Sequence, residues 1–418
     1  MSRRDFLKRS AALAMVAPSL VQAQARGHIV VVGGGFAGIT AAKHLRAFAP
    51  ALRVTLVEPS AAFYSCPLSC RVLLGAMGMR ELTQSYEGFA ARHGVAWIRD
   101  RATGLDAAAR EVVLASGRRV AYDRLIVAPG VDYDYSALPG LASEEAQNRM
   151  PHAWKAGEST IDLRQRIGAL RNGDAFAIHV PKVPFRATAA PYERACIVAT
   201  FMQEQKIKGK VLVFDANADV ANGKDLFTKA WKDRYSGIVE YVPNTNVVSA
   251  STTDNVVELD RGGKVRAALW NVIPPQRAGA VARDMGLANA GGRWCNVDFR
   301  TYESTAVPGV HVIGDSIAGS PGMPKSAHLA NQEAKVCAMA ISRQMANLLP
   351  VEQPVIISAA YSFVSRRDAG HAVRVFRYDN ASKQMLPDAK AGGNSAANEV
   401  EGIYAMAWLS NILGDTFD

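Results

Sequence analysis

The sequence, 418 residues long, predicts an α/β protein with two domains built on parallel sheets and a third domain at the C-terminal end. Two segments, residues 28–60 and 174–215, carry this prediction, because each reads as an apolar strand, a turn, a helix and a second strand. Beyond about residue 350 the chain changes to short strand-like stretches and a closing helix, so we expect residues 351–418 to form an α+β domain. Within it, DAKAGGNSAANE (388–399) reads as a flexible loop.

The first of these segments carries a glycine motif at its turn. Gly33, Gly35 and Gly38 follow the apolar stretch HIVVV with the spacing G-x-G-x-x-G. Glycine at these places lets the backbone turn sharply and approach a pyrophosphate at the helix N-terminus. Glu58, which ends the second strand, is placed to bind a ribose hydroxyl and disfavours a 2′-phosphate. The pattern predicts a Rossmann-like domain that binds a dinucleotide.

Two later segments indicate which dinucleotide is bound. YDRLIVAPG reads as a strand and a turn at Gly130 that close the domain, and a later apolar strand ends at Gly314 and Asp315 before a loop and a helix. In two-domain flavoproteins the acid of such a pair binds the ribitol chain of FAD, and the positive end of the helix dipole faces the flavin pyrimidine ring. We therefore expect an FAD-binding domain made of residues 27–138 and 280–350.

Lys325 lies in the loop between this acid and the helix. Three interpretations of its side chain remain open: it contacts the flavin, it caps the loop, or it is solvated at the surface.

The second strand–turn–helix segment lacks a glycine motif. After the strand that ends at Val180, the turn reads PKVPFR from Pro181 to Arg186. Proline has no backbone N–H to offer a phosphate, and bulky side chains prevent close approach of the backbone. We therefore expect residues 139–279 to form a second, NAD-like domain that does not bind NAD(P)H.

The first 25 residues read as a twin-arginine export signal. Arg3 and Arg4 precede a short apolar stretch, and the string AQA ends at Ala25 as a cleavage site. The apolar stretch is too short to span a bilayer. The sequence thus predicts a signal peptide over residues 1–25, cleavage near Ala25, and a periplasmic protein without a transmembrane segment.

The formal net charge is +10 at pH 7. This charge favours an acidic protein partner, or it serves solubility alone. No cluster of lysine and arginine occurs beyond residue 25, so we expect no nucleic acid partner. We also expect no bound metal ion.

Five cysteines leave at least one unpaired, so they do not form a simple disulfide framework. Cys66 and Cys70, in FYSCPLSC, have three open interpretations: a redox dithiol, a covalent anchor for a cofactor, or packing. Cys196, Cys295 and Cys337 are better explained as buried apolar side chains than as catalytic thiols.

Several uncommon strings match one protein family: PHAWKAGE (151–158), PYERA (191–195), IPPQRAG (273–279) and WLSNILGDTF (408–417). With them the chain resembles the flavoprotein subunit of flavocytochrome c sulfide dehydrogenase, a relative of the sulfide:quinone oxidoreductases and, more distantly, of glutathione reductase. The resemblance implies the two-domain FAD/NAD reductase fold, with residues 351–418 capping the flavin or forming a subunit interface.

The resemblance also implies a covalent flavin. In that family a cysteine in a YTC or YSC context is bonded through sulfur to the flavin 8α-methyl group, and Tyr64-Ser65-Cys66 matches it. Such a bond retains the cofactor outside the cell and raises its potential toward that of a c-type haem. A redox pair of Cys66 with Cys70 is the rival interpretation.

The chain departs from the family at the sulfide site. There, a disulfide over the flavin accepts sulfide, and one of its cysteines precedes PYERA while the other lies in a C-terminal TCYS string. This chain has Ala187 and Ala360 at the two positions. Alanine cannot accept a nucleophile or carry a persulfide, so either sulfide meets the flavin directly or the substrate is another compound.

Three other side chains are candidates for the catalytic site. Glu193 is a possible proton acceptor, although an acid at a helix start also compensates the helix dipole. His328, near the start of the flavin-facing helix, is a base or a structural histidine. Trp408 matches a family aromatic residue near the flavin, with core packing as the alternative.

We therefore expect a periplasmic FAD oxidoreductase that oxidises a small, reduced sulfur compound and passes electrons to a c-type cytochrome. The chain has no C-x-x-C-H string, so haem is expected only on a partner chain. Two alternatives remain: a flavin dehydrogenase for a non-sulfide substrate, and an electron-transfer flavoprotein that binds no substrate of its own.

Overall fold

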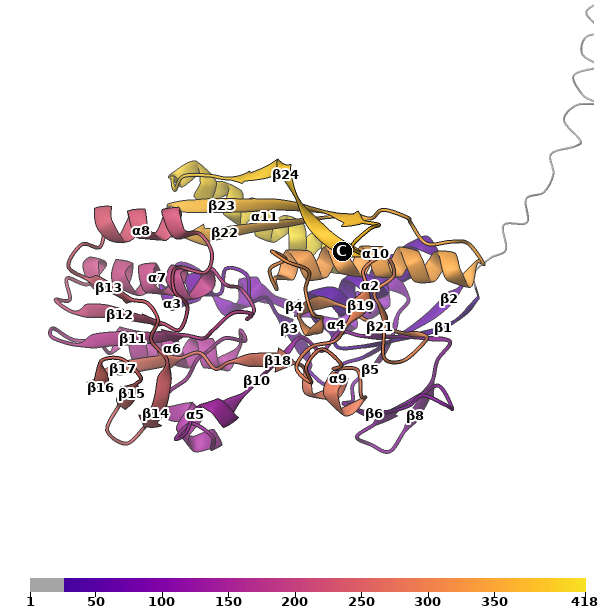
Figure 1. Ribbon diagram of the computed structural model, residues 1–418, viewed down its shortest axis with the longest axis horizontal. Coiled ribbons are helices and arrows are strands. Elements are labelled where there is room, and N and C mark those ends of the chain that lie inside the picture. Colours follow the sequence, from indigo (N-terminus) through magenta and orange to yellow (C-terminus); the bar gives the residue numbers. More distant parts are fainter. Residues whose placement is uncertain (1–25) are drawn as a thin grey trace, which may run out of the picture.

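A computed structural model describes residues 26–418, so the expected export signal and its cleavage site lie outside the described residues. Figure 1 shows two α/β lobes side by side along the longest axis of the molecule, with a three-stranded sheet and the C-terminal helix lying over both. The predicted fold class, two dinucleotide-binding domains of the FAD/NAD reductase type plus a C-terminal domain, is confirmed.

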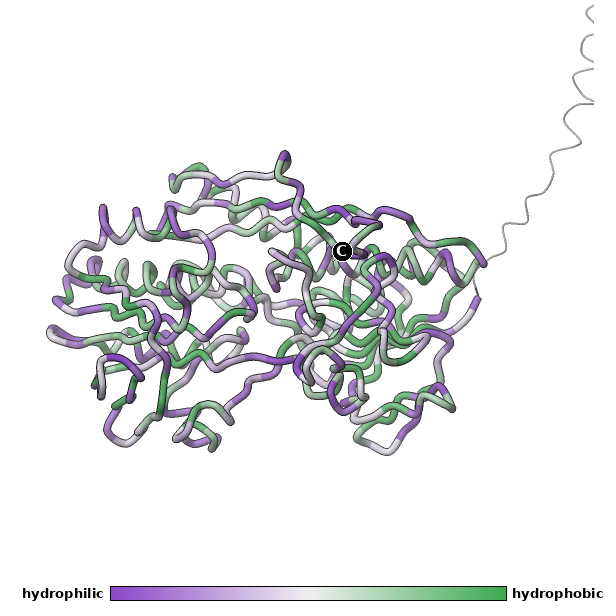
Figure 2. The backbone as a smooth tube through the Cα atoms, in the orientation of Figure 1, coloured by the Kyte–Doolittle hydropathy of each residue, from purple (hydrophilic) through white to green (hydrophobic). Residues whose placement is uncertain are grey.

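The first lobe is built on a seven-stranded sheet in the order β19-β20-β21-β9-β1-β2-β5, parallel from β21 to β5. Its strands are β1 (Gly27–Val32), β2 (Leu52–Val57), β5 (Ala96–Ile98), β9 (Arg124–Val127), β19 (Val297–Asp298), β20 (Glu303–Ser304) and β21 (Val310–Val312). Helices cover both faces of such a sheet, so the central strands are apolar throughout, and Ile29, Val30 and Val31 are fully buried. Figure 2 shows this apolar interior.

Two long helices, α2 (Phe36–Phe48) and α10 (Ala327–Met345), pack along each other in this lobe. Ser326 caps α10 by accepting the Leu329 N–H at 3.2 Å. The smaller elements are β3 (Ala62–Tyr64), α3 (Cys70–Leu73), η1 (Met79–Leu82), β4 (Thr83–Ser85), α4 (Tyr86–His93), β6 (Ala102–Asp106), β7 (Glu111–Leu114), β8 (Arg119–Ala121), α9 (Ala280–Asp284) and η3 (Gly314–Ser316).

The second lobe has a four-stranded parallel sheet in the order β13-β12-β11-β17. A separate apolar cluster that includes Ala177, Val257 and Trp270 joins this sheet to a small antiparallel sheet. The elements of the lobe are η2 (Tyr135–Ala137), α5 (Glu144–Arg149), α6 (Glu158–Gly168), β11 (Ala175–Val180), α7 (Ala190–Glu204), β12 (Lys210–Asp215), α8 (Lys224–Asp233), β13 (Val239–Val242), β14 (Val247–Ser251), β15 (Val256–Leu259), β16 (Gly263–Arg266) and β17 (Leu269–Val272).

Two antiparallel strands, β10 (Val131–Tyr133) and β18 (Gln276–Ala278), join the lobes. Each strand carries the chain across once, and pairing makes them one two-stranded ribbon (Figure 1).

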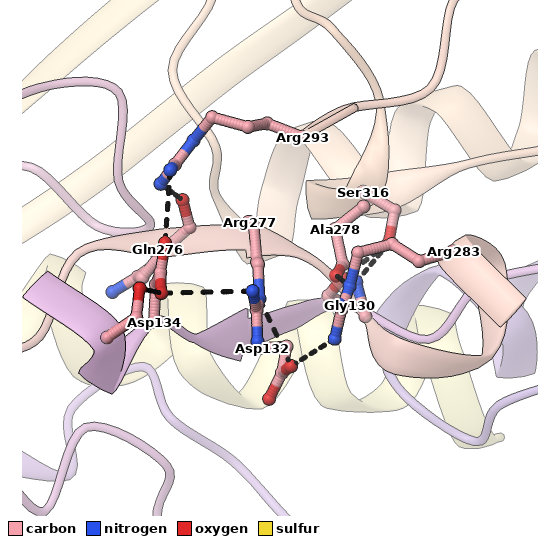
Figure 3. A network of polar contacts seen from close by, with 11 residues as sticks. Gly130, Asp132, Asp134, Gln276, Arg277, Ala278, Arg283, Arg293 and Ser316 are labelled. Atoms are coloured by element: carbon pink, nitrogen blue, oxygen red, sulfur yellow. Dashed lines mark hydrogen bonds and ion pairs between the residues drawn. The ribbon is translucent and has the colours of Figure 1, made fainter. Parts of the chain in front are cut away.

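Five charged side chains line this ribbon in a network (Figure 3). Arg277 lies between two acids, with its Nε 3.5 Å from Asp132 and its Nη1 3.8 Å from Asp134. Arg283 pairs with Asp132 at 2.5 Å, and Arg293 pairs with Asp134 at 3.1 Å. A hydrogen bond from Ser136 and the charges of Arg277 and Arg293 lower the pKa of Asp134. The two crossings are therefore tied by charge as well as by backbone pairing.

The C-terminal domain is an antiparallel sheet of β22 (Val355–Phe363), β23 (Ala369–Asp379) and β24 (Gln384–Asn394), followed by α11 (Glu399–Phe417). The expectation of a flexible loop over residues 388–399 is wrong for its first half, which belongs to β24. An added Cβ at Gly392 would lie 2.3 Å from the Val373 carbonyl oxygen, so glycine serves close strand pairing there. No helix within residues 26–418 is both long and apolar enough to cross a membrane.

Candidate flavin site

The glycine motif forms an open cradle at the start of α2. Gly33 has φ +100° and donates its N–H to the Val57 carbonyl oxygen at 2.9 Å, which ties the turn to β2. An added Cβ at Gly38 would lie 1.9 Å from the Gly33 carbonyl oxygen. An added Cβ at Gly35 would meet no atom within 4 Å, and no side chain caps the helix there. The first-turn N–H groups of α2 therefore face free space, as a pyrophosphate requires.

Glu58 stands beside this cradle. Its carboxylate accepts the Gly34 N–H at 2.8 Å through Oε2 and the Ser60 N–H at 2.9 Å through Oε1. Tyr86 donates its hydroxyl to the Gly34 carbonyl oxygen at 2.9 Å, which fixes the loop from the other side. Each carboxylate oxygen keeps a lone pair for a further donor, so the geometry suits a ribose hydroxyl.

The Gly314–Asp315 turn lies against the starts of both long helices. Gly314 has φ +76°, and an added Cβ there would lie 3.1 Å from the Ala37 Cβ and 3.6 Å from the Ala330 Cβ. Asp315 accepts no side-chain hydrogen bond from any residue in the described chain, and burial raises its pKa. A half-buried carboxylate without a protein donor suits a polyol ligand such as the ribitol chain of FAD.

Gly130 connects the turn after β9 with the Gly314–Asp315 turn. It has φ +68°, and its carbonyl oxygen accepts hydrogen bonds from the Ser316 hydroxyl and, at 2.9 Å, from the Gly279 N–H. This turn therefore links the end of β9 to η3 and to the ribbon (Figure 3).

Lys325 is buried, with 8% of its surface exposed, so surface solvation is wrong as an interpretation. Its ammonium group donates to the Ile317 carbonyl oxygen at 2.5 Å and lies 3.9 Å from the centre of the Trp294 ring. Burial lowers its pKa, and the charge of Asp315 opposes that effect. Lys325 therefore caps the loop after η3, and its charge interacts with that of Asp315.

Cys66 and Cys70 do not share a helix, because α3 begins only at Cys70. The Cys66 sulfur is partly exposed and accepts the Ala156 N–H at 3.5 Å. Cys70 is buried, and burial, followed by the Glu193 charge, raises its pKa to about 12.

The other three cysteines are buried as well: Cys196, Cys295 and Cys337. Burial raises the pKa of each. None of the five forms a disulfide.

Ala187 and Ala360 lie on two segments that meet at the start of α10. Ala187 donates its N–H to the Lys325 carbonyl oxygen at 2.9 Å and has φ +58°, in the left-handed region. Ala359, the neighbour of Ala360, donates its N–H to Nδ1 of His328 at 2.8 Å. Both segments thus reach the start of α10.

Glu193 is buried in the first turn of α7, where its Oε1 accepts the Phe363 N–H at 3.0 Å. Burial raises its pKa to about 7, against the effect of that hydrogen bond and of the Arg71 charge. Glu193 therefore joins α7 to the strand that contains Ala360.

His328 uses Nδ1 to accept the Ala359 N–H, and burial lowers its pKa. The Trp408 ring lies 6.1 Å from the His328 ring and 5.9 Å from the Tyr361 ring. Both candidates thus belong to one cluster that holds β22 against α10 and α11.

Arg186, a partly buried residue beside the site, was not predicted as a site residue from its motif. Its N–H donates to Gln276 Oε1 at 2.8 Å, and its guanidinium donates to the Trp154 carbonyl oxygen. Its charge faces Cys66 and Asp315. Its position next to Ala187 in the sequence could have identified it as a site residue.

His152 was missed as well. Its Nδ1 accepts the Trp154 N–H at 3.0 Å, and its ring lies 4.3 Å from the Tyr133 ring. Burial, and then the charges of Arg194 and Arg186, lower its pKa to about 3. His152 is therefore neutral, and its string PHAWKAGE was the available signal.

In the second lobe, the acid that ends β12 is saturated by the protein. Asp215 Oδ2 accepts the Tyr192 hydroxyl at 2.7 Å and the Tyr241 hydroxyl at 3.0 Å. Its Oδ1 accepts the backbone N–H and the side-chain amide of Asn217, each at 2.8 Å. Asp215 is fully buried, so the position that binds ribose in an NAD domain holds protein groups instead.

Three family models match the chain in turn. Residues 27–165 match "Pyridine nucleotide-disulphide oxidoreductase", residues 160–274 match "Sulfide dehydrogenase [flavocytochrome c] flavoprotein chain, central", and residues 352–417 match "Flavocytochrome c sulphide dehydrogenase, flavin-binding". The chain is a flavoprotein of the flavocytochrome c sulfide dehydrogenase type. The match to the flavin-binding model supports FAD as the cofactor, and the cradle and the unpaired Asp315 carboxylate fit that group.

Curated relatives agree with this family. The mitochondrial sulfide:quinone oxidoreductases of Dictyostelium discoideum and Mus musculus are 24% and 27% identical over 299 residues. These matches cover 69% of this chain but only 65% of each relative. A sulfide dehydrogenase [flavocytochrome c] flavoprotein chain from Chlorobaculum thiosulfatiphilum is 58% identical over 41 residues, which are 10% of this chain and 85% of that relative's sequence.

A solved structure, that of the sulfide:quinone oxidoreductase of Aquifex aeolicus, shares the fold. It superposes with a TM-score of 0.78 at 19% identity and covers 93% of this chain and 91% of its own.

Proposed function

We propose that the protein is a periplasmic FAD-dependent oxidoreductase that takes electrons from a small, reduced sulfur compound and passes them to a c-type cytochrome on another chain. One observation carries the proposal. The backbone N–H groups of Ala187 and Ala359 both donate to residues 325–328, at the start of the helix expected to face the flavin. The names of the relatives, sulfide:quinone oxidoreductase and sulfide dehydrogenase, support a sulfide-type substrate.

Because Ala187 and Ala360 carry no thiol, the substrate reacts without a protein persulfide. FAD, when bound, supplies an acceptor for two electrons, so the oxidation of the substrate needs no disulfide. Both alanines are partly exposed, and we propose that a small nucleophile reaches the start of α10 past their methyl groups. The role of the chain is then to bind the substrate, orient it and remove its proton.

Glu193 is the residue best placed to accept that proton. It lies in the same structural junction as Ala360, since it binds the backbone three residues further along β22. A carboxyl group with a pKa of about 7 exchanges protons readily at neutral pH. Burial supplies that shift.

Cys66 is proposed as the covalent tether of the flavin. Its sulfur is partly exposed and near the charge of Arg186, whereas Cys70 is enclosed. A single partly exposed thiol supports a thioether to FAD and disfavours a dithiol shared with Cys70.

We also propose that the second lobe binds no nicotinamide nucleotide. The saturated Asp215 and the loop after Val180, in which Phe185 is buried, support this proposal. Electrons then enter from the substrate and leave to a protein, for which a c-type cytochrome is the acceptor we propose.

The test is anaerobic addition of sulfide or polysulfide to the purified holoprotein, followed by the absorbance of oxidised flavin. Loss of the band within seconds is the expected result. Absence of bleaching with both reagents contradicts the sulfur substrate.

A second candidate, a flavin dehydrogenase for another small reductant, rests on the replacement of both site cysteines by alanine. A screen of reductants other than sulfur compounds, read by the same absorbance, tests it. Rapid reduction by any small molecule also excludes a flavoprotein without a substrate of its own. Reoxidation by an added c-type cytochrome then tests the acceptor.

A further inference from the structure

A buried carboxyl group, Glu333, lies behind the Gly314–Asp315 turn. It belongs to the second turn of α10, and 4% of its surface is exposed. Its Oε2 accepts the Gly314 N–H at 2.7 Å. Glu333 therefore binds the backbone of the residue that precedes Asp315, and neither the sequence motifs nor the proposed reaction uses it.

Four ionisable groups face Glu333. Asp315 belongs to η3 and Lys325 to the following loop, Tyr302 directly precedes β20, and Cys337 belongs to α10 itself. Glu333 lines one small cavity together with Asp315 and Lys325. Glu333 thus lines the same cavity as Asp315, the acid that we expect to bind the ribitol chain.

Tyr302 supplies a second observation. Its hydroxyl is fully buried and has no hydrogen-bond partner within residues 26–418. Burial, and then the Glu333 charge, raise the pKa of Tyr302. Buried polar groups normally have hydrogen-bond partners. The unpaired Tyr302 hydroxyl therefore indicates that the region around Glu333 is polar and does more than fill the core.

The surroundings favour the neutral form of Glu333. Burial and then the Asp315 charge raise its pKa to about 8, although the Gly314 hydrogen bond and the Lys325 charge act the other way. At neutral pH the carboxyl group therefore carries its proton, and one oxygen still accepts from Gly314.

We propose that Glu333 is a positioning residue for FAD, which holds the Gly314–Asp315 turn in place and, where it is ionised, takes up a proton as the flavin gains negative charge on reduction. Two electrons and one proton give the flavin ring one additional negative charge. A proton on Glu333 removes the opposing carboxylate charge from the same region. The proton comes from solvent, and the electrons come from whichever reductant is supplied.

The sign of the effect follows from linkage. Below about pH 8, Glu333 is protonated whether the flavin is oxidised or reduced, so it adds nothing to the pH dependence of the potential. Above that pH, Glu333 is ionised beside oxidised flavin and takes up a proton when the flavin is reduced. The midpoint potential therefore falls more steeply with pH in a window that begins near pH 8.

The experiment is a redox-dye titration of the holoprotein from about pH 6 to about pH 10, with the flavin absorbance as readout. It involves neither the sulfur substrate nor the cytochrome, so its failure is distinct from failure of the proposed function. We expect the wild-type profile to steepen near pH 8 and the Glu333→Gln profile to lack this change. Glutamine still accepts the Gly314 N–H, so the variant retains FAD.

The matched control is Glu303→Gln. Glu303 also accepts a glycine N–H, that of Gly309 at 2.7 Å, and we expect its variant to keep the steepening. A wild-type profile without the change overturns the proposal, and so does a Glu333→Gln profile that keeps it. If Glu333→Gln does not fold, Glu333→Asp serves instead: it should keep the steepening at a shifted pH, and its loss there overturns the proposal.

Discussion

At the residue scale, the surroundings of Cys66 and Cys70 separate two thiols that their spacing alone leaves equivalent. Cys70 is buried with a pKa of about 12, so it stays protonated and is a poor nucleophile. Cys66 is partly exposed. The spacing of the pair carries no information about this difference.

The first prediction concerns this pair. Cys66→Ala should release FAD when the protein is denatured in acid, whereas Cys70→Ala should keep it, because only Cys66 is proposed to bond the flavin. Absorbance of the washed, denatured chain measures retention. Colour that washes out of the wild type contradicts the tether and restores the dithiol interpretation.

The second prediction concerns Glu193. Below about pH 7 its carboxyl group is protonated and cannot accept a proton, so the rate of flavin reduction should rise with pH and level off above that value. Glu193→Gln should reduce the rate by about 10²-fold and abolish this rise. Stopped-flow reduction measures both.

Ionisation of the substrate affects the wild-type and variant rates equally. Its effect therefore cancels in the ratio of the two rates at each pH. Glu399→Gln, at an exposed glutamate of α11, is the control and should behave as wild type. A constant ratio across the pH range argues against Glu193 as the proton acceptor.

At the scale of elements, the ribbon of β10 and β18 bears on stability. Asp134 is shared between Arg277 and Arg293, and its pKa is lowered. Its contribution to stability is therefore complete above the unfolded-state pKa of about 4 and is lost as the pH falls through the lower folded-state value.

The third prediction follows. Asp134→Asn should lower the free energy of unfolding by about 1 kcal/mol at neutral pH, and less at high salt, because these pairs are partly solvated. Denaturant titration measures the change. Asp233→Asn, which breaks an exposed pair with Lys229 on α8, is the control and should have a smaller effect. If both substitutions lower the free energy of unfolding equally, the network stabilises the protein no more than an exposed ion pair does.

At the scale of the whole molecule, the two lobes share a sheet design but differ at the nucleotide edge. The first lobe leaves the turn at Gly35 open, while the second fills the equivalent region with Tyr192, Tyr241 and Asn217 around Asp215. This difference supports the proposal that the second lobe serves as a scaffold for the segment that carries Ala187.

The fourth prediction tests that difference. NADH added anaerobically should leave the flavin absorbance unchanged, because no ribose position is free. Asp215→Ala should lower the free energy of unfolding by about 2–4 kcal/mol without creating NADH reactivity, since it leaves buried hydroxyl groups unpaired. Rapid bleaching of the wild type by NADH contradicts the scaffold role.

The sequence by itself determined the fold class, and it predicted the residues of the FAD half of the site. Gly33, Gly38 and Glu58 could be identified because their roles depend on backbone geometry within one strand–turn–helix unit, which local spacing records. The strands and closing helix of the C-terminal domain could be recognised as well, since apolar patterning is also local. The β24 residues were misassigned because small residues mark a loop and a closely paired strand equally well.

Only the tertiary structure decided the surroundings of the site. The burial of Lys325, the saturation of Asp215 and the contact of Glu333 with Gly314 all depend on partners far away in the sequence. The pKa values of Glu193 and Glu333 are set by burial in the folded chain, which spacing does not encode. Sequence motifs thus indicated which chemistry the chain supports. Packing decided which side chains are accessible and which are neutral or charged.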